Sequence, residues 1–227
     1  DISQKEITLQ EDTSRHVVQV MRMKKGDRFN LTDGKGYLLT CTIIDDNKKH
    51  CQVTVNSSQF TPRYSRKTSI AISLLKNSSR FEWFLEKATE LGISEIIPLI
   101  CTRTEKQKFR ADRMKNILIS AMLQSQQVWL PLLHEPIAYE LLFRQEEITS
   151  FPRKMIAHCI ESEKKKITDL QNSTTDSQII LIGPEGDFTP EEIDMALQKH
   201  FIPVTLGPTR LRTETAGVTA AVLFQAT

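Results

Sequence analysis

From Thr68 to its end, the chain alternates two kinds of apolar pattern, and this alternation constrains the fold more than any other feature. Residues 70–75 form a short apolar run typical of a buried strand, and residues 81–91 then place apolar side chains on one helix face. The pattern predicts further strands at 93–100, 154–159, 178–182 and 203–206, and further helices at 114–127, from Pro190 onwards and at 214–224. Alternating strands and helices predict a mainly parallel sheet covered by helices, the α/β class.

Residues 1 to about 60 have a different, β-rich pattern. Strands are expected at 7–9, 28–31, 37–44 and 50–55, with a short helix at 13–21. Between two of these strands, Asp33-Gly34-Lys35-Gly36 is a strong hairpin signal. Residues 57–67, which contain Pro62 and several basic side chains, are typical of a linker. The sequence therefore predicts two domains, a small one at 1–67 that includes the linker and a larger one at 68–227.

The charges do not by themselves identify a nucleic-acid-binding protein. The formal net charge is only +2, but basic side chains gather between residues 61 and 80 and again between 101 and 115. Clusters of this kind can contact a phosphate backbone. The alternative is a pair of solvated loops, so the charge distribution is compatible with an RNA partner without requiring one.

Neither the cysteines nor the histidines predict a metal site. The four cysteines form no C-x-x-C pair, and the five histidines include no H-E-x-x-H pattern. No apolar run approaches the roughly 20 residues that span a bilayer, and no charged-then-apolar leader begins the chain. The sequence therefore predicts a cytoplasmic protein with reduced, buried thiols, without a metal and without membrane contact.

A glycine-containing loop, LIGPEGDF (181–188), follows a predicted strand and leads into a helix. In open α/β sheets, ligands bind at such strand-to-helix turns. No lysine follows the glycines, and Glu185 and Asp187 make the loop acidic, so it is not a P-loop for phosphate. It suits a neutral or cationic ligand with hydroxyls and amines, such as S-adenosylmethionine. The alternative is a tight turn whose acids balance the helix dipole.

A second loop of this kind, LGPTRLRTETAG (206–217), also leaves a predicted strand and enters a helix. Thr213 or Thr215 is a candidate cap for that helix, with Glu214 in its first turn. The two arginines before the helix could stabilise an anion; their alternative role is an ion pair with an acid of either loop. Two strand-to-helix loops in succession favour a composite pocket between them.

Both loops resemble those of one enzyme family. IGPEG (182–186), followed by LG (206–207) and RLRTETA (210–216), is similar to the signature of the RsmE family. These are SPOUT-class methyltransferases that act on N3 of one uridine, uracil 1498, in 16S ribosomal RNA of the small subunit. Asp187 departs from the pattern, because a second glycine is usual there, and the family's first strand is expected to begin before Asp1. Further matches, which extend the similarity to nearly the whole chain, are HVVQVMR (16–22), GD (26–27), FE (81–82), EKATELG (86–92), Pro98, QS (124–125) and Pro131.

The resemblance implies a fold, a cofactor and partners. The first domain is expected to be a PUA-like β-barrel that binds RNA, and the second a SPOUT-type parallel-sheet domain with a trefoil knot. S-adenosylmethionine is the expected cofactor, small-subunit ribosomal RNA within the assembled 30S subunit the expected substrate, and a homodimer the expected assembly. The cofactor is expected on Leu181, Ile182, Gly183, Pro184, Glu185, Gly186, Leu206, Gly207, Arg210, Leu211, Arg212, Thr215 and Ala216.

Methylation of uracil N3 requires loss of the N3 proton, which leaves negative charge on the ring oxygens. Arg212, ahead of Arg210, is the candidate for stabilising that charge. Glu185 or Glu214 is the candidate proton acceptor, with solvent hydroxide as the alternative. In a base pair N3 is hidden, so we expect the target nucleotide to be unpaired or extruded. The candidate phosphate contacts are Arg15, Arg22, Lys24, Lys25, Arg63, Arg66 and Lys67.

Three other functions stay open at this point. One is a non-catalytic RNA-binding protein with the α/β domain as a scaffold, although two intact glycine-containing loops argue against it. Another is a SPOUT methyltransferase with a different RNA target. The third, a nucleotide-phosphate enzyme on a doubly wound sheet, is disfavoured by the acidic first loop and the absence of G-x-G-x-x-G.

Overall fold

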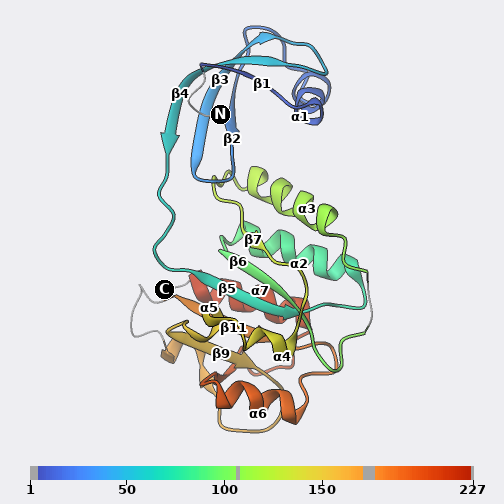
Figure 1. Cartoon of the computed structure of the whole chain (residues 1–227), viewed down its shortest axis with the longest axis vertical. Coiled ribbons are helices and arrows are strands. Elements are labelled where there is room, and N and C mark those ends of the chain that lie inside the picture. The colour runs from blue at the N-terminus through green and yellow to red at the C-terminus, as the bar shows by residue number, and fades with distance from the viewer. Residues whose placement is uncertain (1–4, 106–107, 171–176, 226–227) are drawn as a thin grey trace. The chain divides into compact units, whose positions relative to one another are not determined.

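The computed structural model describes residues 5–105, 108–170 and 177–225. The chain divides into two compact units, Asp1–Arg63 and Tyr64–Thr227, whose elements are labelled in Figure 1. The domain boundary expected between residues 67 and 68 stays a prediction. Among the described residues, no helix is both long and apolar enough to cross a membrane. Within the same ranges, no three His, Cys, Asp or Glu side chains are grouped so that they could hold a metal ion.

The first unit is a four-stranded antiparallel sheet with a helical segment beside it (Figure 1). The strand order is β1-β4-β3-β2. Buried side chains of this unit, among them Val17, Cys41, Ile43 and Val53, form a core of their own. The elements are β1 (Glu6–Thr8), α1 (Glu11–Arg15), the π-helical turn η1 (His16–Val20), β2 (Arg28–Thr32), β3 (Tyr37–Asp45) and β4 (Gln52–Phe60).

The hairpin predicted between β2 and β3 is confirmed. Gly34 and Gly36 have φ angles of 69° and 102°, a region that favours glycine. The predicted linker, in contrast, begins later than residue 57, because β4 continues to Phe60 opposite Tyr37. The side chains in this last stretch of β4 are exposed and mostly polar. A paired backbone with exposed polar side chains gives no hydrophobic alternation for the sequence to display.

The second unit contains the predicted parallel sheet, in the order β10-β12-β9-β11-β5-β6-β7, with β8 also paired to β6. Its strands are β5 (Thr68–Ser73), β6 (Glu95–Ile100), β7 (Leu132–Leu133), β8 (Ile137–Ala138), β9 (Arg153–Ala157), β10 (Lys165–Lys166), β11 (Gln178–Ile182) and β12 (Ile202–Thr205). Its helices are α2 (Ser78–Glu90), α3 (Ala111–Gln124), α4 (Tyr139–Leu142), α5 (Glu146–Thr149), the 3₁₀ turn η2 (Ile167–Leu170), α6 (Pro190–Gln198) and α7 (Thr213–Gln225).

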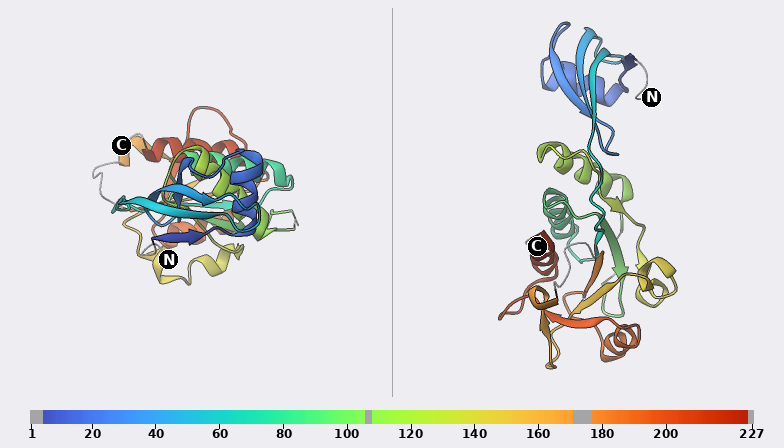
Figure 2. Two further views of the ribbon diagram at one scale, coloured as in Figure 1. Left: turned by 90° about the horizontal axis from the view of Figure 1, so that it is seen from above. Right: turned by 90° about the vertical axis from the view of Figure 1, so that its left-hand side faces the viewer.

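Helices cover both faces of this sheet, as Figure 2 shows. Along β11, Ile180 and Ile182 pack into a core with α2, α3 and α7. Ile179 and Leu181 of the same strand pack into a second core with α4, α5 and α6. A strand buried on both faces is a continuous apolar run, which is why residues 178–182 were predictable as a strand of a covered parallel sheet.

Signals at the helix ends are also confirmed. The hydroxyl of Thr189 accepts a hydrogen bond from the Glu192 amide at 3.2 Å, and the Glu192 carboxylate accepts one from the Thr189 amide at 2.8 Å. This reciprocal pair caps α6. Gly92 follows α2 with a φ of 74°. The short elements β7, β8, α4, α5, β10 and η2 were not predicted, because segments of two to four residues carry no periodic signal.

Candidate functional site

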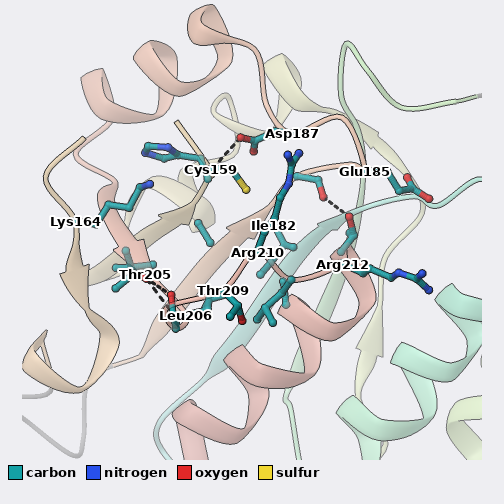
Figure 3. Close-up of a pocket in the computed structure, with 18 of the residues that line it drawn as sticks. Cys159, Lys164, Ile182, Glu185, Asp187, Thr205, Leu206, Thr209, Arg210 and Arg212 are labelled. Atoms are coloured by element: carbon teal, nitrogen blue, oxygen red, sulfur yellow. Dashed lines mark hydrogen bonds between the residues drawn. The ribbon is translucent and has the colours of Figure 1, made fainter. Parts of the chain in front are cut away.

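A cavity of about 500 Å³ lies where β9, β11 and β12, neighbours in the sheet, reach their carboxyl ends (Figure 3). Small-molecule sites typically measure roughly 300–1,000 Å³, and the carboxyl edge of a parallel sheet is where they form. Three segments make the wall: the turn after β9, the loop after β11, and the loop after β12 with the first turn of α7. The lining residues are Ala157, His158, Cys159, Lys164, Ile182, Gly183, Pro184, Glu185, Asp187, residues 204–213 and Ala216.

The two glycine-containing loops meet in this cavity, as the sequence predicts. The hydroxyl of Thr213, at the start of α7, donates a hydrogen bond to the carbonyl of Gly183 at 2.9 Å (Figure 3). Both residues are buried. Because a buried carbonyl requires a partner, this bond fixes the spacing between the loops. Thr213, one of the two threonines predicted to cap α7, therefore joins the second loop to the first.

The loop after β11 is held in a tight conformation. A Cβ atom at Gly183 would lie 3.0 Å from the ring of Phe188, so a larger residue would displace that side chain. Arg103, which follows β6, donates a hydrogen bond to the carbonyl of Gly186 at 2.7 Å. Asp187 has a φ of 64°, a left-handed conformation that costs a non-glycine residue about 1 kcal/mol or more. This conformation explains why a glycine was expected at position 187.

The third wall segment, which follows β9, was not predicted from the sequence. The amide of Cys159 donates a hydrogen bond to Asp187 Oδ2 at 2.8 Å (Figure 3), so this turn is attached to the first glycine-containing loop. Lys164 and the buried His158 complete its contribution to the wall. The sequence signal was the strand at 154–159 itself, but its position beside β11 and β12 depends on a strand order that the sequence does not reveal.

The two arginines of the second loop both line the cavity and are exposed. In Figure 3 the side chain of Arg210 extends towards Asp187, whereas that of Arg212 extends away from Arg210 on the other side of the loop. Within the described residues, neither arginine takes part in an ion pair. Their charges are therefore available to a ligand or a substrate.

The two candidate proton acceptors have different environments. Glu185 is exposed and lines the cavity. Glu214 is buried, does not line the cavity, and has one oxygen 3.7 Å from Nε of Arg80. Its Oε2 atom has no hydrogen-bond partner among the described residues. Of the two acids, Glu185 is the one that a bound molecule can reach.

The expected cofactor residues fall into two groups. Leu181 is fully buried in the core with α4, α5 and α6, and Gly186 and Thr215 also do not line the cavity. The expected residues that do line it are Ile182, Gly183, Pro184, Glu185, Leu206, Gly207, Arg210, Leu211, Arg212 and Ala216.

Comparison with known proteins identifies the family. Residues 62–225 match a model of the RNA methyltransferase domain, and residues 9–56 match one of the RNA methyltransferase PUA domain. The ribosomal RNA small subunit methyltransferase E (RsmE) of Synechocystis is 32% identical over 97% of this chain and 73% of its own length. The chain belongs to the RsmE family.

Solved structures related to this RsmE-family chain have the same fold. A probable rRNA-methyltransferase from Porphyromonas gingivalis is 35% identical, with a TM-score of 0.90 over 100% of this chain and 96% of its own. The RsmE of Neisseria gonorrhoeae, solved bound to S-adenosyl methionine, is 28% identical, with a TM-score of 0.86 over 97% and 91% of the two chains. The second unit is thus a SPOUT-type methyltransferase domain, and a small PUA domain precedes it.

The predicted RNA contacts of this RsmE-family chain differ in their surroundings. Arg15 pairs with Glu11 at 2.6 Å on the surface. Lys67 pairs with the buried Glu95 at 2.9 Å, and Arg66 donates a hydrogen bond to the carbonyl of Phe224, so these two have structural roles already. The remaining candidates, Arg22, Lys24, Lys25 and Arg63, are exposed.

Proposed function

We propose that this protein is an S-adenosylmethionine-dependent methyltransferase that modifies N3 of the uridine at position 1498 of 16S ribosomal RNA. Membership of the RsmE family gives the reaction and the RNA. The observation that carries the proposal for this chain is the meeting of its two glycine-containing loops, joined by Thr213 and Gly183, around one cavity.

The cavity fits the methyl donor in size and in charge. S-adenosylmethionine carries a sulfonium, an ammonium and a carboxylate group, and the wall offers acidic and basic side chains, Glu185 and Asp187 on one loop and Arg210 on the other. Exposed backbone near Gly207 and Pro208 allows a flat ring to approach closely. Bound there, the donor supplies an electrophilic methyl group. Holding it in a fixed orientation removes much of the entropic barrier to transfer.

The chain's own side chains provide the remaining chemistry. Arg212 stabilises the negative charge that develops on the uracil oxygens, because a positive group placed before the reaction needs no rearrangement during it. Glu185 accepts the N3 proton, directly or through water. Glu214 has an indirect role, since it is buried beside Arg80 and does not line the cavity.

The proposed partners follow from the reaction. The substrate is the assembled 30S subunit, with the target uridine extruded from its surroundings, and a protein that acts on it is cytoplasmic. Two copies of the SPOUT-type domain form a homodimer; Val222 of α7 and Leu123 of α3 expose 47% and 55% of their surface and are available for such a contact. Light scattering during gel filtration tests the assembly, and a monomeric mass at micromolar concentration would contradict it.

Methyl transfer tests the proposed function directly. Purified protein is incubated with labelled S-adenosylmethionine and either 30S subunits or free 16S RNA that lack the modification, and the nucleosides are identified by mass spectrometry. We expect 3-methyluridine at position 1498, with more product from the assembled subunit. Binding of the RNA without methyl transfer would indicate the non-catalytic alternative, and methylation of a different nucleotide would indicate another target.

The basic side chains proposed to bind phosphates make a separate prediction. Exposed Arg22, Lys24 and Lys25 lie together in sequence, and removing a cation that binds a phosphate makes the RNA affinity less dependent on salt. The triple substitution of these residues by Ala is expected to weaken RNA binding at low salt and to flatten its salt dependence. Unchanged binding at every salt concentration would remove them from the RNA interface.

A further inference from the structure

His158 is the buried polar side chain in the cavity wall that the proposed mechanism does not use. It follows the last residue of β9, lines the cavity and exposes only 9% of its surface. Neither Nδ1 nor Nε2 forms a hydrogen bond of normal geometry with a described residue, although the backbone of Ile160 lies close enough to act on the ring. Leaving such a group unpaired is unfavourable by about 1–3 kcal/mol, so a wall position of this kind indicates a polar group on the ligand.

The surroundings of His158 favour the neutral form of its imidazole. Burial and the positive charge of Lys164 lower its pKa, and the negative charge of Asp187 and the backbone of Ile160 oppose this only in part. The other charged groups of the wall are Glu185, Arg210 and Arg212. A neutral imidazole donates one hydrogen bond and accepts one, which matches a hydroxyl group and adds no positive charge beside a cationic ligand.

Asp187 holds the turn that carries His158. Asp187 Oδ2 accepts a hydrogen bond from the amide of Cys159, and its Oδ1 accepts one from the amide of Phe188 at 2.9 Å. The carboxylate thus joins the turn after β9 to the loop after β11 (Figure 3). Asp187 occupies a left-handed backbone position that a glycine would adopt more easily, and both of its carboxylate oxygens are used in hydrogen bonds.

We propose that His158 binds the methyl donor, its imidazole forming a hydrogen bond with a ribose hydroxyl of S-adenosylmethionine, and that Asp187 positions His158 by holding the backbone of Cys159. The proposal rests on the proposed function, because it assumes that the donor occupies this cavity. The ring nitrogens are shielded by the surrounding atoms, so the proposal requires the imidazole to rotate about its side-chain bonds when the donor binds.

Isothermal titration of S-adenosylmethionine tests the role of His158. His158→Phe, which keeps an aromatic ring without nitrogens, is expected to weaken binding about tenfold, equivalent to about 1.4 kcal/mol, without lowering Tm. His158→Asn, which retains a donor and an acceptor, is expected to lose less affinity than His158→Phe. The control is His50→Phe, an exposed histidine of the first unit, with wild-type affinity. Wild-type affinity in His158→Phe, or equal losses in both variants together with a lower Tm, would overturn the proposal.

The pH dependence of binding provides a readout that a packing role would not change. The pKa of His158 is lowered by burial and by Lys164, so the imidazole gains its proton only at a pH below the usual range of histidine. Protonation places a positive charge beside the sulfonium, so the affinity for S-adenosylmethionine is expected to decrease as the pH is lowered. S-adenosylhomocysteine lacks the sulfonium charge, and its affinity is expected to fall less. In His158→Phe, the ratio of the affinities for S-adenosylmethionine and S-adenosylhomocysteine should no longer change with pH. Identical profiles in wild type and variant would contradict the proposal.

Substitutions at Asp187 separate positioning from backbone strain. Asp187→Asn keeps an oxygen acceptor for the Cys159 amide and tolerates the left-handed conformation, so near-wild-type affinity is expected. Asp187→Gly relieves strain but removes the acceptor, so binding should weaken about fivefold while Tm stays within about 2 °C. The control is His200→Gly, which relieves a left-handed φ of 64° outside the cavity and should leave affinity unchanged. Wild-type affinity in Asp187→Gly would refute the positioning role.

Failure of this inference is distinguishable from failure of the proposed function. If the wild-type protein binds S-adenosylmethionine and methylates 30S subunits while every His158 variant does the same with equal affinity, only the inference is wrong. If the wild-type protein binds no donor at saturating concentration, the proposed function is wrong and the inference falls with it.

Discussion

The two ends of the parallel sheet carry polar residues that are arranged in opposite ways. At the amino end, the buried Glu95 of β6 accepts hydrogen bonds from Ser69, Lys67 and His134 at 2.5, 2.9 and 2.7 Å. At the carboxyl end, His158 forms no side-chain hydrogen bond of normal geometry with a described residue, and Arg210 and Arg212 form no ion pair there. Polar groups whose hydrogen bonds and ion pairs are formed within the protein stabilise the fold, whereas polar groups without such partners at a cavity are available to bind a ligand.

The hydrogen bonds at the amino end of the sheet keep Glu95 negatively charged. Burial alone would raise its pKa, but the hydrogen bonds from His134, Ser69 and Lys67 outweigh burial and lower the pKa to about 2. A carboxylate whose pKa is depressed in the folded state stabilises the fold above its unfolded pKa. The contribution of Glu95 is therefore complete above about pH 4.5 and is lost as the pH falls towards about 2.

The largest effect is expected at the carboxyl end, on activity alone. Arg212→Ala should lower kcat about 100-fold, equivalent to about 2.7 kcal/mol, because the charge on the uracil oxygens loses its stabilising partner. Steady-state methylation of 30S subunits measures kcat. Titration measures the affinity for S-adenosylmethionine and thermal melting measures Tm, and neither the affinity nor Tm should change. The control Arg144→Ala removes an exposed arginine outside the cavity. Full turnover in Arg212→Ala would exclude its catalytic role.

The next effect is expected at the amino end, on stability alone. Glu95→Gln should lower the free energy of unfolding at pH 7 by about 2 kcal/mol, because buried donors lose their charged acceptor. Urea unfolding measures this change, and the affinity for S-adenosylmethionine should stay the same. The matched variant is Glu185→Gln at the carboxyl end, which should lower activity without changing stability. If Glu95→Gln had wild-type stability but bound S-adenosylmethionine more weakly, the amino end of the sheet would serve binding and not stability, contrary to the comparison.

Acid titration sharpens the same contrast. Between about pH 4.5 and 2, the wild-type protein should lose the stability that Glu95 contributes, so the difference in unfolding free energy between wild type and Glu95→Gln should shrink as the pH falls. Urea unfolding at a series of pH values follows this difference. A difference that stays constant over this range would mean that the charge of Glu95 is not what stabilises the fold.

An intermediate effect on both properties is expected where the loops are joined. Thr213→Val leaves the buried carbonyl of Gly183 without its donor, which should reduce stability by about 1.5 kcal/mol and donor affinity severalfold. Thr213→Ser keeps the hydroxyl and is the control for the missing hydrogen bond. Unfolding in urea and titration of S-adenosylmethionine measure the two effects. Reduced stability with intact affinity would mean that the bond serves the fold only.

The smallest effect is expected at the capped end of α6. Thr189→Ala removes the hydroxyl that accepts from the Glu192 amide, and N-cap substitutions of this kind reduce stability by about 1 kcal/mol. Thermal melting should show the decrease, and donor affinity should stay at the wild-type value because Thr189 does not line the cavity. Weaker binding of S-adenosylmethionine in Thr189→Ala would show that the start of α6 is coupled to the part of the β11–α6 loop that lines the cavity.

The sequence predicted those features that leave a local signal. The apolar runs of β5 and β11, the cap of α6 and the two glycine-containing loops all depend on neighbours in the chain. The turn containing His158 and Lys164 escaped prediction because its role arises from the strand order, which brings β9 between β11 and β12. For the same reason the different surroundings of Glu185 and Glu214 were not predictable. The knotted path was implied by the family resemblance alone, since no pattern of residues indicates one.

The proposed function depends most on one claim, that the loops after β11 and β12 enclose the methyl donor. A crystal structure of the protein with saturating S-adenosylmethionine tests it directly. We predict electron density for the donor in the cavity between Gly183 and Leu211, with its methyl group directed towards Glu185 and Arg212. Density for the donor elsewhere on the protein, or a cavity that stays empty at saturation, would contradict the account.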